Sequence, residues 1–99
     1  MQYLFEGLEP PKRRRHHYPK TVVEAVEALG RDINDTDKAH IRDLAKHNEL
    51  KKLHHGFETF VINEFGLHDG NDALIANTGE SLAEEAALVI IAKFAETLL

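Results

Sequence analysis

Histidine is the residue type in this sequence most often used for metal binding and acid–base chemistry, and the chain contains seven histidines. His40, His47 and His54 are spaced by seven residues, whereas two metal ligands on one helix face are usually three or four residues apart. A helix break expected near Asn48 also separates His54 from the other two. The chain has no cysteine and no H-E-x-x-H signature. We therefore predict no metal site and no bound cofactor, and we interpret the histidines as ordinary surface or core residues.

His68 and Asp69 are adjacent in a glycine-flanked turn, where an imidazole can act as a general base. A base needs a nucleophile to activate, and Ser81, which is the only serine, is expected to cap a helix instead. The sequence contains no phosphate-binding glycine loop, no dinucleotide fingerprint and no paired-carboxylate signature. We therefore predict that the protein is not an enzyme, and we interpret the turn as a structural corner between two helices.

A run of cationic residues near the N-terminus is the clearest partner signal in the sequence. Four fixed positive charges can neutralise phosphates and release counterions, and a neighbouring aromatic side chain can stack on an exposed base. This predicted nucleic-acid-binding set consists of Lys12, Arg13, Arg14, Arg15 and Tyr18. Two alternatives stay open for the run: a solvated tail, or a tail that folds onto the protein's own acidic surface.

Charge divides the chain into two parts. Residues 1–20 contain five of the twelve Lys and Arg and two of the seventeen Asp and Glu, a net charge of +3, whereas residues 21–99 have a net charge of −8. An acidic body repels nucleic acid but suits basic protein surfaces, because charge complementarity speeds encounter. We therefore predict a non-catalytic macromolecule-binding protein, foremost a small acidic protein-binding module such as an inhibitor, immunity or adaptor protein. A nucleic-acid-associated protein that uses the basic run is the alternative, and an enzyme or metal-binding protein comes third.

Length and composition are typical of one globular domain: 99 residues, 42% of them hydrophobic and 29% charged. No apolar run reaches the ~18–20 residues needed to cross a bilayer. The N-terminal residues also lack the order of features that marks a secretory signal. We therefore expect a cytoplasmic protein without membrane association, with residues 1–18 as a flexible or docked N-terminal arm and residues 19–99 as a single helical domain.

Apolar residues repeat at intervals of three and four along most of the chain, which predicts an all-α fold of four or five short helices. Thr21 and Glu24 form a capping box before the first helix, and Gly30 is placed to end it. Ser81 and Glu84 form a second capping box before the last helix. The expected helices span about residues 22–29, 35–47, 49–64, 72–76 and 82–99.

The helix expected over residues 49–64 carries an apolar stripe in which His54 lies between Leu50 and Phe57. We predict that His54 is a buried polar residue whose ring nitrogen bonds a neighbouring group, and a pH-sensitive or binding role is the alternative. Gly66 follows this helix and is expected to adopt a positive φ as its C-terminal cap. Asn71 is expected to cap the short helix that comes next.

The last expected helix is apolar almost all round, with Glu85 and Lys93 marking a narrow polar stripe that Val89 interrupts. Such a helix is either central to the fold or shared with a second subunit. Homodimers commonly bury apolar patches about a twofold axis, so we predict a homodimer with Val89, Ile90 and Phe94 at the contact. The alternative is a monomer in which this helix is central and Val89 is an isolated exposed apolar residue.

Two segments of the sequence carry a resemblance to a known family. The first reads Leu-His-His-Gly-Phe over residues 53–57, and the second contains Asn63, Phe65, Gly66, Leu67, His68, Gly70 and Asn71. Together with an opening Pro-x-Thr, they make residues 19–99 resemble a family of small helical bacterial domains of unknown function with L-H-x-G-L and N-x-F-G-L-x-x-G-N patterns. The sequence departs from these patterns at Phe57, where leucine is preferred, and at His68, where tryptophan is usual. The resemblance implies a helical domain and transfers no activity.

Overall fold

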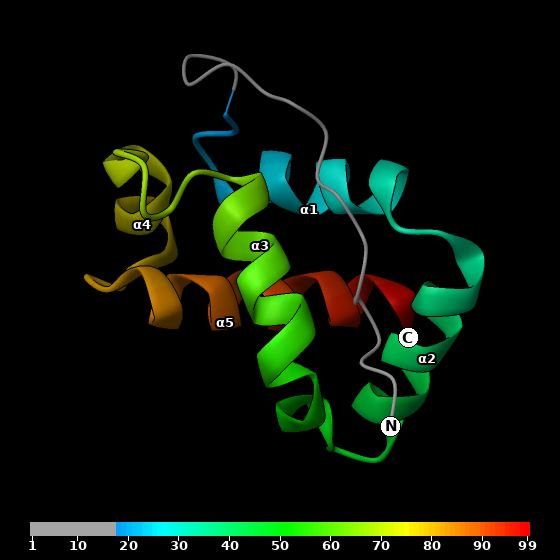
Figure 1. Ribbon diagram of the computed structural model, residues 1–99. Coiled ribbons are helices and arrows are strands. Elements are labelled where there is room, and N and C mark those ends of the chain that lie inside the picture. Colours follow the sequence, from blue (N-terminus) through cyan, green and yellow to red (C-terminus); the bar gives the residue numbers. More distant parts are fainter. Residues whose placement is uncertain (1–17) are drawn as a thin grey trace.

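The computed structural model describes residues 18–99, apart from the side chains of residues 53–55. The described chain is helical and contains no strand, which confirms the predicted all-α class (Figure 1). Its elements are α1 (Val22–Asp32), α2 (Asp35–Lys46), the 3-10 turn η2 (Leu50–Leu53), the π-helical turn η3 (His54–Glu58), α3 (Thr59–Glu64), α4 (Asp72–Thr78) and α5 (Ala83–Leu98).

The first helix starts where the sequence predicts and ends later. The Thr21 hydroxyl accepts from the backbone N–H of Glu24 at 3.1 Å and donates to its carboxylate at 3.0 Å, so the predicted cap is confirmed. The sequence predicts that Gly30 ends the helix. This prediction is wrong, because Gly30 lies inside the helix. The helix gains a further turn because Ile33, 3% exposed, packs into the core, and the Ile33 N–H donates to the Leu29 carbonyl at 2.9 Å.

The second helix lies almost where expected, but its cap is one residue earlier. The side chain of Asn34, rather than that of Asp35 or Thr36, accepts from the backbone N–H of Asp37 at 2.8 Å. The helix ends at Lys46, and Asn48 follows with φ of 59°. The left-handed backbone conformation of Asn48 turns the chain, so the helix break expected near Asn48 is confirmed.

The stretch predicted as one helix over residues 49–64 is instead three short pieces: η2, η3 and α3. A π turn fits one more residue than an α turn and so changes which side chains face inward. Phe57 at the end of η3 and Phe60 and Val61 in α3 are thereby all buried. Gly56 lies in the π turn. The predicted burial of His54 falls on a side chain outside the described residues.

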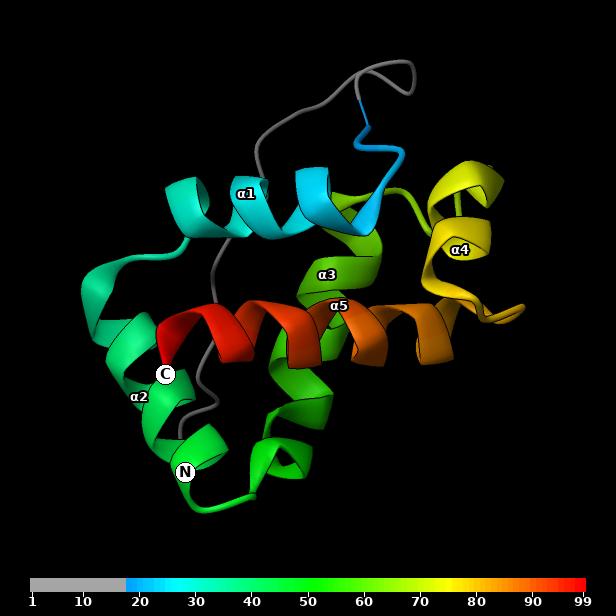
Figure 2. The same cartoon turned by 180° about the vertical axis from the view of Figure 1, so that it is seen from behind.

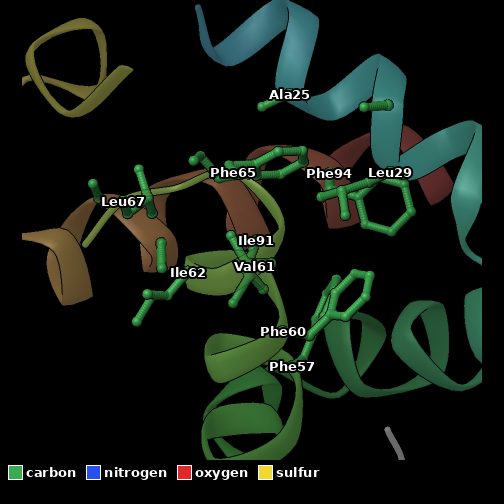
Figure 3. Packing of buried hydrophobic residues seen from close by; sticks show 14 of the residues in the cluster. Ala25, Leu29, Phe57, Phe60, Val61, Ile62, Phe65, Leu67, Ile91 and Phe94 are labelled. Atoms are coloured by element: carbon green, nitrogen blue, oxygen red, sulfur yellow. The ribbon is translucent and has the colours of Figure 1, made fainter. Parts of the chain in front are cut away.

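The last helix is central to the fold, as one of the two interpretations requires. It packs against α1, α2, α3 and α4, and Figure 2 shows α1 alongside it, with α2 near its C-terminal end. The Phe57 ring lies 6.2 Å from Phe60 and 6.3 Å from Phe94, measured between ring centroids (Figure 3). The nearly all-round apolar character of α5 therefore reflects its contacts within one chain.

Two predictions about α5 are wrong. Ile90 and Phe94 are 0% and 1% exposed, so they belong to the core of the single chain and not to a subunit contact. The helix also begins at Ala83 after Leu82, without the predicted cap from Ser81. The Glu84 carboxylate instead lies 3.2 Å from the ring Nε2 of His68. None of the helices in residues 18–99 is long and apolar enough to cross a membrane.

Candidate functional site

The loop that joins α3 to α4, residues 65–71, is called the corner loop below. Gly66 has φ of +65° and directly follows the C-cap residue Phe65, as predicted. The N–H of Leu67 donates to the Ile62 carbonyl at 3.0 Å, which is the 6→1 hydrogen bond of a Schellman motif. Leu67 and Ile62 are both buried, which supplies the apolar contact that accompanies this motif. The corner between α3 and α4 is therefore fixed by local backbone geometry.

Asn71 ties the corner loop to the beginning of the domain. It occupies the N-cap position of α4, but the prediction that its side chain caps this helix is wrong. The Asn71 amide nitrogen instead donates to the carbonyls of Pro19 at 2.9 Å and Phe65 at 2.7 Å. Its amide oxygen accepts from the Lys20 ammonium at 3.5 Å. Because Asn71 is only 2% exposed, these bonds are made away from water, where leaving them unmade is costly.

Tyr18 lies against the same loop. Its ring covers Gly66 so closely that a Cβ added to Gly66 would overlap it, and its hydroxyl donates to the Asp69 carboxylate at 3.4 Å. Tyr18 was grouped with the basic run as a base-stacking residue. The structure places its ring on the folded domain, partly buried, while Lys12, Arg13, Arg14 and Arg15 lie outside the described residues.

The remaining polar residues of the corner loop are exposed and engaged with other parts of the chain. The ring of His68 pairs with Glu84 at 3.2 Å, and both side chains are more than half exposed. Gly70 has φ of +84°, and Asn63 just before the loop is exposed. No three His, Asp or Glu side chains among the described residues gather closely enough to hold a metal ion. The loop thus joins α3 to α4.

A second feature, which we call the valine groove, opens between α1 and α5 beside the end of α4. It encloses about 620 Å³. Its apolar lining consists of Val22, Val23, Val26 and Val89. Val23 is 69% exposed, which is unusually open for a large apolar side chain. The groove is therefore an apolar surface that the chain's described residues leave uncovered.

Charged and polar side chains border the groove. Glu27 lies on the α1 side, and Lys93 and Glu96 lie on the α5 side. The Lys93 ammonium is 3.6 Å from the Glu96 carboxylate, and both are more than half exposed. At one end, the backbone N–H of Val22 donates to the side-chain oxygen of Asn77 at 2.8 Å, which joins the start of α1 to α4.

The groove exists because α1 carries apolar residues on two faces. Ala25, Ala28 and Leu29 are buried in the core and Val26 is partly buried against it, whereas Val23 is 69% exposed on another side of the helix. On α5, Val89 is partly exposed while its neighbour Ile90 is buried. Sequence reasoning identified Val89 from its place in a polar stripe. It assigned Val22, Val23 and Val26 to the apolar face of the first helix together with Leu29, and did not foresee that these valines line an open groove. It also missed the buried carboxylate of Glu64, which follows Val61 by three residues.

Comparison with known proteins places the chain in a family without assigning it a function. No curated protein and no solved structure matches the sequence. A family model matches residues 18–98, from the tyrosine on the corner loop to the end of α5. The chain belongs to the family described as "Domain of unknown function (DUF6794)".

Proposed function

We propose that this domain is a non-catalytic module that binds another protein through the valine groove. The single observation that carries this proposal is the open apolar lining, in which Val23 is 69% exposed beside Val22, Val26 and Val89. Covering such side chains releases roughly 25 cal/mol per Å² of apolar surface. Concave apolar grooves bordered by charge are the usual receptors for an amphipathic helix. A cytoplasmic location is part of the same proposal.

The charge of the domain indicates the character of the partner. Residues 21–99 have a net charge of −8, and Glu27 and Glu96 stand on opposite sides of the groove. A partner segment with apolar side chains for the groove and Lys or Arg beside them matches this border. Electrostatic attraction then speeds association, and the apolar contact sets how long the complex lasts.

A non-catalytic role is supported by what the acid–base side chains of the described residues do. The ring of His68 pairs with Glu84, and Asp69 accepts from Tyr18. The His47 ring is 2.8 Å from the Asp43 carbonyl. These contacts hold loops and helix ends in place, and none of them aligns a base with a nucleophile.

Capture of a partner from a nuclease-treated lysate of the native host tests the proposal. The bait is the full chain, compared with Val23→Asp and with the matched control Ala39→Asp on the exposed surface of α2. We expect wild type and Ala39→Asp to capture the same protein and Val23→Asp to lose it. Equal capture by all three baits, or loss of capture on nuclease treatment, would overturn the proposal.

A homodimer through Val89 is a competing use of the same groove. Two concave grooves that face each other leave a hollow between them, whereas a stable dimer needs close packing over about 800 Å² per subunit. We therefore favour a protruding segment over a second copy. Sedimentation equilibrium of the full chain separates the two, because a dimer weakened by Val89→Glu supports the second copy and a constant monomer mass excludes it.

Nucleic-acid binding through Lys12, Arg13, Arg14 and Arg15 is the second candidate, and the four adjacent positive charges favour it. If all four neutralise phosphates of duplex DNA, the logarithm of affinity should fall with the logarithm of salt with a slope of about −3.6. Anisotropy with short DNA and RNA measures this slope. Absence of binding at low salt, or a slope unchanged when the four residues become alanine, removes this candidate.

A further inference from the structure

No described residue covers the valine groove. Residues 1–17 belong to the same chain and are attached close to the groove, so they are the first candidate to cover it. The floor of the groove is formed by the side chains of Val22, Val23, Val26 and Val89, which offer water no hydrogen bond. A covering segment must supply apolar side chains for the floor and cationic side chains near Glu27 and Glu96.

We infer that residues 3–15 of the same chain occupy the valine groove, with the apolar side chains of residues 3–8 on its floor and the basic run of residues 12–15 beside the carboxylates of Glu27 and Glu96 at its border. The inference rests on the proposed function, because it assigns a competitor to the same binding surface. The arm and a partner protein then compete for the groove, and the partner must displace the arm to bind.

The composition of this segment matches the groove in kind. Its apolar side chains are Tyr3, Leu4, Phe5 and Leu8. Pro10 and Pro11 follow and separate the apolar part from the basic run in the sequence. The four positive charges at residues 12–15 are then the only part of the segment that needs acidic neighbours.

The point at which the arm joins the domain puts the groove within reach. Tyr18 is held on the corner loop, and α1 begins only four residues later at Val22, which itself lines the groove. Residues 3–17 span about 50 Å when extended, and the longest dimension of the molecule is 33 Å. The arm is therefore long enough to turn back and lie along the groove.

Attachment to the same chain strengthens such a contact. A short tether gives its ends an effective concentration on the order of millimolar, so a segment with only millimolar affinity in a separate peptide is about half bound when tethered. The charges add to this effect, since the arm is cationic and residues 21–99 have a net charge of −8. Added salt should weaken this part of the attraction.

The absence of cysteine allows a direct test on the full chain. A spin label on Gln2→Cys should broaden the methyl NMR signals of Val22, Val23, Val26 and Val89. The signal of Ile62, buried in α3 on the far side of α5, serves as the internal control (Figures 2 and 3). We expect loss of this selective broadening when Leu4 and Phe5 are changed to serine, which alters no described residue, and when Val23 is changed to aspartate.

Three results would overturn the inference. They are no selective broadening of the groove valines, broadening that survives both sets of substitutions, and broadening seen only when spin-labelled chains are mixed with isotope-labelled wild type. The last result would assign the groove to the arm of a second copy. Failure of the inference stays separate from failure of the proposed function, because the capture experiment with Val23→Asp has its own outcome whether or not the arm binds.

Discussion

The corner loop and the valine groove differ in how completely their side chains are packed and hydrogen-bonded. In the corner loop, every buried polar group of Asn71 has a partner, and Tyr18 closes over Gly66 without space for a side chain. In the groove, four valines face an open volume and the ion pair at its border is exposed. The side chains of the corner loop hold one backbone geometry, whereas the groove leaves apolar surface exposed. The corner loop thus fixes the fold, and the groove is the surface that the proposed function assigns to a partner.

The largest expected effect comes from Asn71→Ala. The substitution leaves the carbonyls of Pro19 and Phe65 buried without a donor, and each unpaired group costs roughly 1–3 kcal/mol. We expect the free energy of unfolding, measured with urea, to fall by about 2–4 kcal/mol. Asn63→Ala on the exposed surface of α3 is the control, with an expected change under about 0.5 kcal/mol. Similar changes in both variants would mean that the loop is not the anchor described here.

The second effect separates backbone strain from packing. Gly66→Ala puts a β-carbon on a residue with φ of +65° and against the Tyr18 ring, whereas Gly79→Ala has φ of +84° but open space around it. We expect Gly79→Ala to cost about 1 kcal/mol from conformation alone and Gly66→Ala to cost about 2–3 kcal/mol. Chemical denaturation of both variants measures the difference. Equal losses would show that Tyr18 yields to the added methyl group.

These two regions also differ in how far the sequence predicts them. Gly66 was correctly expected to end a helix, because the apolar stripe before it stops there and a Schellman motif needs only local residues. The same reasoning was wrong for Gly30, since burial of Ile33 extends α1 past the glycine. The partner of Asn71 could not be predicted, because Pro19 lies 52 residues away in the chain.

The groove was less predictable still, for a physical reason. It forms only where α1 and α5 come together, and neither helix contains it alone. Val89 stood out because it interrupts a polar stripe, but Val23 looks like an ordinary core residue until Ala25 and Leu29 are seen to fill that role. The π turn at residues 54–58 escaped prediction in the same way, since the need to bury Phe57 together with Phe60 and Val61 arises from tertiary packing.

A smaller effect is expected at Glu49, which lies outside both regions and shows what an exposed contact contributes. The Lys52 ammonium, 2.6 Å from the Glu49 carboxylate, lowers the pKa of this carboxyl through its hydrogen bond and then through its charge. A lowered folded-state pKa stabilises the fold above the pKa of the unfolded chain, and this contribution is lost as pH falls through the folded-state value. Wild type should therefore be slightly more stable than Glu49→Gln near pH 7. The difference should vanish in acid and in 1 M salt, and a difference that grows in acid would contradict this assignment.

The smallest effect on stability is expected at the groove itself, from Val23→Asp. Val23 is 69% exposed in the first turn of α1, so little apolar burial is lost. A carboxylate there gains about 0.3–1 kcal/mol from the helix dipole. Glu27, four residues on, repels it by a similar amount, because like charges one turn apart are destabilising. We therefore expect a net change within about 0.5 kcal/mol in urea unfolding, together with loss of partner capture. A loss of several kcal/mol would place Val23 in the core after all and remove the contrast between a closed corner loop and an open groove.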